Sequence, residues 1–167
     1  MSENQSSQST MSLTLSSSRL LLRLPVPADA QALRDFHVRN DAYLAPTDPP
    51  RPDGFATLPH WRRYIASSQK MFREGIGYRF VIADKENPTH IIGKSNLGQV
   101  FRGPFWACYL GYAIDQEHEG QGKMFEANQR LIEYAFEELH LHRIMANYLP
   151  TNDRSGRLLR RLGFVIE

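Results

Sequence analysis

Apolar positions along this chain recur at helical spacing in some segments and form short strand-like runs in others. The helical spacing predicts helices over residues 28–40, 61–72, 125–139 and 153–162. Runs rich in leucine, aromatic or β-branched residues predict strands at 20–24, 78–83, 90–100, 105–115 and 142–149, with a further strand starting at Phe164. Short turns join the three strands between residues 78 and 115, which indicates an antiparallel meander. A long loop at 45–59, with five prolines and a glycine, separates the first two helices.

The first eighteen residues differ from the rest because eight of them are serine. Such a stretch buries too little apolar surface to offset its ordering entropy, so we expect a disordered tail over 1–18 and one domain over 19–167. The tail lacks the basic start and apolar block of a secretory signal. A transit peptide would share its serine content and low acidity, but no arginine precedes Arg19.

Composition narrows the class of protein. The 167 residues and 19.2 kDa fit a single domain, and the 41% hydrophobic and 23% charged residues are ordinary for a soluble α/β or α+β domain. No apolar run approaches the roughly 20 residues that span a bilayer, so we expect a cytoplasmic protein without a membrane partner. Cys108 is the sole cysteine, which excludes a disulfide framework. A net charge of +2 is too small to indicate a nucleic-acid partner.

The strongest chemical signal is a predicted strand, then Glu119-Gly120-Gln121-Gly122-Lys123, then a helix. Two glycines allow a tight turn that brings successive amides toward one point, and the helix adds its unpaired N-terminal amides. This arrangement suits a phosphate or pyrophosphate, with Lys123 as a mobile cation beside it. It is neither the dinucleotide-binding fingerprint, since the third glycine and the βαβ unit are missing, nor a P-loop. The alternative is a plain strand-to-helix turn in which the glycines serve the geometry alone.

Together with the preceding Tyr109-Leu110-Gly111-Tyr112-Ala113-Ile114-Asp115, this loop resembles the acetyl-CoA motif of the GNAT acetyltransferase superfamily. Further similar segments lie at 19–23, 93–96, 102–103, 107–112, 142–148 and 152–156, and they resemble the RimJ-like ribosomal-protein alanine N-acetyltransferases. The resemblance covers Arg19 to Glu167. It implies the GNAT fold, an α+β sandwich in which helices flank a mixed, mainly antiparallel sheet, and transfer of the acetyl group of acetyl-CoA to a primary amine.

The resemblance also implies which residues hold the cofactor. The pantetheine arm would bond to the backbone of Tyr112, Ala113 and Ile114, and the pyrophosphate to amides of Glu119, Gly120, Gln121, Gly122, Lys123 and Met124. Asn152 and Ser155 would contact the cofactor, with Ser155 as the proton donor to the departing thiolate. Glu117 stands where the family usually has Gln or Arg, so its side chain should point to solvent.

The resemblance leaves the acceptor open. It favours the N-terminal α-amine of a ribosomal or other protein, and a small amine such as a polyamine, aminoglycoside or amino acid is the alternative. Family members continue into two more strands after the Leu-Gly-Phe segment, so the chain is expected to be truncated inside the first of them. Without those strands the sheet would have an unfinished edge, through which a homodimer could form. The chain could also be a non-catalytic acyl-CoA-binding module.

The residues also bear on the mechanism. An α-amine with a pKa near 7.8 is roughly 10–20% neutral at pH 7, whereas a lysine amine is well under 1% neutral. An enzyme without a strong base therefore acetylates an N-terminus more easily. Tyr109, Glu126 and His118 are candidate bases acting through water.

His140 and His142 have no third ligand at metal spacing, so no metal site is predicted. Four arginines between 154 and 161 fit a solvated face, a phosphate site or an RNA surface.

Overall fold

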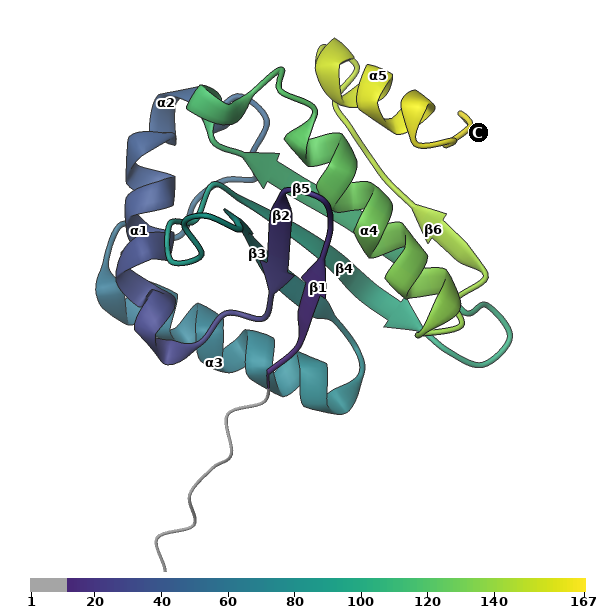
Figure 1. The fold of residues 1–167 in the computed structure, drawn as a ribbon, viewed down its shortest axis with the longest axis horizontal. Helices are drawn as coiled ribbons and strands as arrows, with labels where there is room; N and C mark the ends of the chain where they lie inside the picture. The colour runs from purple at the N-terminus through teal and green to yellow at the C-terminus, as the bar shows by residue number, and fades with distance from the viewer. Residues whose placement is uncertain (1–11) are drawn as a thin grey trace, which may run out of the picture.

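The computed structural model describes residues 12–167, and a six-stranded sheet forms its centre. The strands lie side by side in chain order, and all neighbours are antiparallel except the last pair, which is parallel. Figure 1 shows the strands, which are β1 (Thr14–Ser16), β2 (Leu20–Arg23), β3 (Tyr78–Asp84), β4 (Gly93–Phe101), β5 (Ala107–Ile114) and β6 (Arg143–Met145). The predicted mixed, mainly antiparallel sheet with flanking helices is confirmed.

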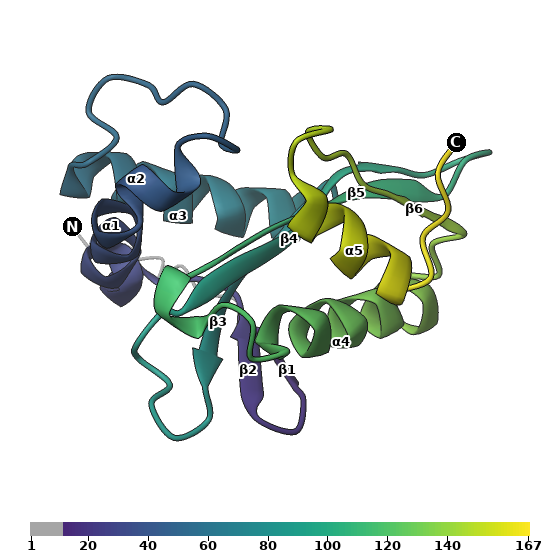
Figure 2. The same cartoon turned by 90° about the horizontal axis from the view of Figure 1, so that it is seen from above.

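Helices cover both faces of the sheet (Figure 2). The elements on one face are a short 3-10 turn η1 (Pro27–Asp29), α1 (Ala30–Arg39), α2 (Asp41–Leu44) and α3 (Leu58–Glu74). On the other face lies α4 (Lys123–Glu137), which follows a second 3-10 turn η2 (Gln116–His118), and α5 (Asp153–Arg161) stands near the β6 end. None of the helices within residues 12–167 is long and apolar enough to cross a bilayer.

Each helical layer has its own apolar core, because each long helix turns one hydrophobic stripe toward the sheet. Ala127 and Leu131 of α4 are fully buried against strand residues such as Leu22 and Leu97. On the opposite face, Phe36 of α1 and Trp61 of α3 pack in a second cluster. The two cores hold the strands between them, so β5 and the residues that follow it are presented on a rigid base.

The predicted disordered tail is wrong for its last residues. Thr14–Ser16 form β1, which pairs antiparallel with β2, and Leu15 is buried in the core. Leu13 and Leu15 alternate with polar neighbours, as in a strand with one buried face, and both leucines pack on the core. The high serine content made this alternation easy to overlook. The rest of the predicted tail, residues 1–11, lies outside the described part of the chain.

The predicted strands at the C-terminal end are also corrected. The strand predicted over 142–149 is limited to β6, and residues 164–167 form no strand. After β6 the chain turns toward α5, where the ring of Tyr148 lies so close to Gly156 that an added Cβ would be 2.9 Å from it. Position 156 therefore has no room for a side chain, which explains the glycine in the Asn-x-x-Ser-Gly segment.

Candidate active site

β5 loses its strand partner halfway along its length. It pairs with β6 only from Ala107 to Tyr109, so from Leu110 to Ile114 its outer edge has no strand neighbour among residues 12–167. A cavity of about 840 Å³ opens there, with walls from β5, the glycine loop, α5 and the segment around α2. An unpaired strand edge offers backbone donors and acceptors to an extended ligand.

The cavity gathers residues that are far apart in the sequence. All but one of the predicted cofactor residues line it, namely Tyr112, Ala113, Ile114, Glu119, Gly120, Gly122, Lys123, Met124, Asn152 and Ser155. The exception is Gln121, whose side-chain amide donates to the carbonyl of Glu117 outside the cavity. Glu117 is exposed and does not line the cavity, as expected for a carboxylate near an anion site.

The glycine loop has a backbone shape that requires glycine. Gly120 and Gly122 have φ values of +72° and +74°, in the left-handed region that side-chain-bearing residues rarely adopt. α4 begins at Lys123, so its first amides, which have no partner within the helix, face back toward this turn. The loop and the positive end of the helix dipole together can hold an anion such as pyrophosphate.

A buried carboxylate anchors the start of this loop to α1. Asp115 is 2% exposed, accepts a 2.6 Å hydrogen bond from Arg39 and caps η2 by accepting from the amide of Glu117. Burial opposes the ionisation of Asp115, but these hydrogen bonds and the charge of Arg39 lower its pKa overall. The side chain of Asn40 accepts from the amide of Gln116, which adds a second tie. The glycine loop is therefore held at a defined distance from the α1 layer.

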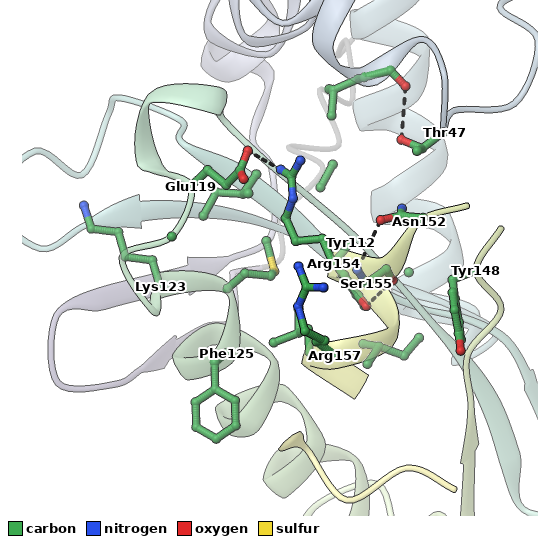
Figure 3. Close-up of a pocket in the computed structure, with 18 of the residues that line it drawn as sticks. Thr47, Tyr112, Glu119, Lys123, Phe125, Tyr148, Asn152, Arg154, Ser155 and Arg157 are labelled. Carbon is green, nitrogen blue, oxygen red and sulfur yellow. Dashed lines mark hydrogen bonds and ion pairs between the residues drawn. The ribbon is translucent and has the colours of Figure 1, made fainter. Parts of the chain in front are cut away.

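Lys123 differs from its prediction as a mobile cation. Its ammonium forms a 2.9 Å ion pair with Asp84 of β3 and lies 3.0 Å from Nδ1 of His118. Only 11% of its side chain is exposed, and Figure 3 shows it extending away from the other labelled residues. Burial and the neighbouring Lys123 lower the pKa of His118. The ammonium braces the loop against β3.

Three side chains from three elements form what we term the clasp, made of Tyr43, Glu119 and Arg154. The hydroxyl of Tyr43 donates a 2.6 Å hydrogen bond to the Glu119 carboxylate and accepts one of 2.6 Å from Arg154. Arg154 also forms an ion pair with Glu119 (Figure 3). Burial and the bond to Glu119 raise the pKa of Tyr43 to about 12. The clasp ties α2 and α5 to the glycine loop across the cavity.

A second polar pair lies on the β5 wall. The hydroxyls of Tyr112 and Ser155 are 2.7 Å apart, and the side-chain oxygen of Asn152 accepts from the amide of Ser155 at the start of α5. Burial raises the pKa of Tyr112, although the bond to Ser155 opposes the shift. Asn152 therefore positions Ser155 as a helix cap. The sequence interpretation assigned a role only to the backbone of Tyr112. Because Tyr112 and Ser155 are 43 positions apart, no local pattern could predict that their hydroxyls meet.

The candidate bases do not converge on the cavity. Glu126 accepts hydrogen bonds from Ser17 and from the backbone and side chain of Arg19 and does not line the cavity. Burial opposes its ionisation, but these bonds lower its pKa overall, which makes it a weaker base. Tyr109 also lies outside the lining, and only His118 is part of it.

Residues of the proline-rich region and the segment before it form the remaining wall. Tyr43, Leu44, Thr47 and Asp48 line the cavity. The sequence interpretation predicted a loop at 45–59 and assigned no helix to 41–44, because a helix of four residues leaves no periodic pattern. Arg154, Arg157 and Arg161 of α5 line the cavity too, whereas Arg160 faces a separate surface hollow.

Cys108 and Phe105 lie outside this site, and no metal-ligand cluster accompanies it in the described residues. Burial raises the pKa of the Cys108 thiol to about 12, so it is a core residue and a poor nucleophile. Within residues 12–167 no three His, Cys, Asp or Glu side chains gather as metal ligands would. Phe105, just before β5, is 74% exposed and lies outside the cavity lining.

Comparison with known proteins links these features to acetyl transfer. Residues 19–165 match the Acetyltransferase (GNAT) domain family. The chain is 41% identical over 150 residues to the ribosomal protein uS5-alanine N-acetyltransferase of Escherichia coli, which covers 90% of this chain and 77% of that protein. It is 30% identical over 155 residues to the putative ribosomal N-acetyltransferase YdaF of Bacillus subtilis, covering 89% and 79%. The crystal structure of ribosomal-protein-S5-alanine acetyltransferase from Vibrio fischeri superposes with a TM-score of 0.87 at 33% identity, covering 93% and 84%.

Proposed function

The chain belongs to the GNAT acetyltransferase family, and from this premise we propose that it moves the acetyl group of acetyl-CoA to the α-amine of a protein N-terminus. The first candidate acceptor is a ribosomal protein that begins with alanine, since the relatives in E. coli and V. fischeri carry that activity in their names. The observation that carries the proposal is the cavity beside the unpaired edge of β5, where nearly all the predicted cofactor residues meet.

The two ends of the cavity suit the two parts of acetyl-CoA. The amides of the glycine loop and the start of α4 would bind the pyrophosphate, and Arg157 and Arg161 stand close enough to the same cavity to meet a further phosphate. The unpaired edge at Tyr112, Ala113 and Ile114 would hydrogen-bond the amide-containing pantetheine arm as a missing strand would. The thioester would then lie near the hydroxyls of Tyr112 and Ser155.

Those hydroxyls supply the proton that the reaction needs. Attack of a neutral amine on the thioester carbon forms a C–N bond and places a negative charge on the carbonyl oxygen, which a main-chain amide near Ile114 would stabilise. Collapse breaks the C–S bond, and Ser155 donates its hydroxyl proton to the thiolate of CoA. Tyr112, whose raised pKa keeps it protonated, can replace that proton through the 2.7 Å contact.

The charge of the cavity favours a peptide over a polycation. Lys123 is paired with Asp84 and Arg154 with Glu119, so the remaining charges of the lining are those of Arg157 and Arg161 against the single carboxylate of Asp48. A polyamine or an aminoglycoside carries several positive charges and would be repelled by such a lining. A single α-ammonium at the end of a peptide avoids most of that repulsion.

The experiment is an acetyl-transfer assay with purified protein, acetyl-CoA and short synthetic peptides, in which released CoA thiol is measured. An alanine-first peptide should react, and the same peptide with an acetylated N-terminus and an internal lysine should not. Spermine, kanamycin and free alanine test the alternative acceptors. Binding of acetyl-CoA in a thermal melt without turnover of any amine would instead support the non-catalytic module.

Two further expectations belong to this proposal. β6 is the last strand of the sheet within residues 12–167, and its outer edge is open to pairing with a second copy. Light scattering would detect such a homodimer by its mass.

A cytoplasmic location follows from a ribosomal acceptor, and fractionation of cells would test it.

A further inference from the structure

The ionisable groups around the cavity are unevenly distributed. Its arginines belong to α5, at the end proposed for the cofactor phosphates, and Lys123 lies at the glycine loop. The two carboxylates are Glu119 and Asp48, and Glu119 is already bound by Tyr43 and Arg154. Asp48 is thus the one lining carboxylate in the described residues that the clasp does not use. It follows α2, whose ribbon lies beside α1 and α3 (Figure 2), and α2 meets α5 through the Tyr43–Arg154 hydrogen bond of the clasp.

The local structure holds Asp48 firmly at this wall. Its backbone amide donates a 2.9 Å hydrogen bond to the carbonyl of Leu44, and Leu44 is buried in the core beside α1 and α3. The hydroxyl of Thr47 donates to the same carbonyl at 3.2 Å. The side chain of Asp48 is 25% exposed. The backbone of Asp48 is therefore anchored to the core at the cavity wall.

Two positive groups face Asp48, and each also makes other contacts. Arg51 donates a 3.4 Å hydrogen bond to one carboxylate oxygen of Asp48, and its guanidinium also pairs with Asp41 and lies over the ring of Phe55. The ammonium of Lys94, on β4, lies over the rings of Trp61 and Tyr64. Burial raises the pKa of Asp48 more than Lys94 lowers it, so the carboxylate is a stronger base than an exposed aspartate. It keeps lone pairs free for another donor.

We propose that Asp48 is the acceptor-amine subsite, where its carboxylate binds the α-ammonium of the incoming N-terminus and takes up one of its protons. This inference rests on the proposed function. At pH 7 roughly nine in ten α-amines are protonated and cannot attack a thioester. One N–H proton passes to a carboxylate oxygen of Asp48 and from there to water, which leaves the nitrogen lone pair to form the C–N bond. When the C–S bond breaks, the nitrogen loses its second proton to water and Ser155 gives its own proton to the thiolate. Water then returns a proton to Ser155 through Tyr112, so one proton is released to solvent for each acetyl group transferred.

The test compares Asp48→Asn with Asp53→Asn, a matched change in the same loop at an exposed aspartate outside the cavity. With saturating acetyl-CoA, kcat/KM for the alanine-first peptide should fall about ten- to a hundredfold in Asp48→Asn, as expected for loss of a charge-assisted contact. Asp53→Asn should match the unmodified protein. The Kd of acetyl-CoA should change less than about twofold in both.

A binding measurement separates a contact with the amine from a structural role. In the presence of CoA, the unmodified protein should bind the free-amine peptide more tightly than its N-acetylated form, and Asp48→Asn should lose that preference by calorimetry. Asp48→Glu, which keeps the charge, should retain it and serves as the variant of choice if Asp48→Asn does not fold.

Three results would overturn the inference. Equal kinetics in Asp48→Asn and Asp53→Asn would do so while leaving the proposed function intact. Loss of acetyl-CoA binding in Asp48→Asn, with the fold retained, would mean that Asp48 supports the cofactor half. Absence of transfer by the unmodified protein would count against the proposed function, and equal binding of the free and acetylated peptides would then also remove the amine subsite.

Discussion

The hydroxyl of Tyr112, on β5, lies 2.7 Å from the hydroxyl of Ser155, in the first turn of α5. The two residues are separated by 43 positions and meet only because the chain after β6 turns away from the sheet. Their contact joins the strand edge proposed for the pantetheine arm to the group proposed as proton donor. Cofactor positioning and protonation of the leaving group therefore depend on one junction.

Removing either hydroxyl should slow acetyl transfer without preventing acetyl-CoA binding. We expect Ser155→Ala to lower kcat about 10²- to 10³-fold, in the usual range for a general acid, and Tyr112→Phe to lower it by less if it acts through Ser155. The double variant should then be no slower than Ser155→Ala alone, because the two groups act in series. Steady-state kinetics with an alanine-first peptide measure this, and an unchanged kcat in Ser155→Ala would exclude its role.

Gly120→Ala should weaken the binding of acetyl-CoA through the shape of the backbone. At φ +72° alanine costs about 1–2 kcal/mol, which should lower the melting temperature by a few degrees. Gly103→Ala is the matched control, because Gly103 has φ +79°, equally open surroundings and a position outside the cavity. Both variants should lose similar stability, and only Gly120→Ala should raise the Kd of acetyl-CoA. Equal Kd values would argue against anion binding by this loop.

The ion pair of Lys123 and Asp84 should matter for stability rather than for phosphate binding. Lys123→Met and Asp84→Asn each leave a mostly buried partner unpaired, so each should lower the free energy of unfolding by about 1–3 kcal/mol. The Kd of CoA should change little and in the same direction in both. If Lys123 instead held a phosphate, Lys123→Met would weaken CoA binding while Asp84→Asn would not. Chemical denaturation and calorimetry distinguish the two cases.

His37 should make stability depend on pH. It is 4% exposed, stacks on Trp61 with ring centroids 4.3 Å apart, and neither ring nitrogen has a hydrogen-bond partner within the described residues. Burial, helped by nearby positive charges such as Lys94, lowers its pKa to about 2. The unfolded chain binds a proton below about pH 6.5, whereas folded His37 stays neutral, so stability falls as the pH drops through that value.

The slope of this fall should approach about 1.4 kcal/mol per pH unit for one proton. His37→Phe keeps an aromatic ring beside Trp61 and removes the titration, so it should flatten the curve between about pH 4 and pH 6. Denaturation curves at several pH values measure the difference. Parallel curves for the two proteins would show that His37 does not contribute.

Local pattern alone was enough for much of this protein. Helical spacing located α3 and α4 to within a few residues, because each helix buries one stripe over several turns. The glycine loop could be identified for a similar reason, since positive φ angles demand glycine and the next helix supplies amides. Resemblance of short motifs to a family added Asn152 and Ser155, which periodicity does not mark.

Tertiary structure decided what the local pattern could not. Lys123 lies beside the glycine loop in sequence, yet its ammonium pairs with Asp84 across the fold, 39 positions away. β1 exists because β2 pairs with it and the core accepts Leu15, although its serines favour disorder when considered alone. Asp48 reaches the cavity only through the packing of Leu44. The local sequence determines which helices, strands and turns are low in free energy. The partner of a charge and the walls of a cavity depend instead on contacts between segments that are distant along the chain.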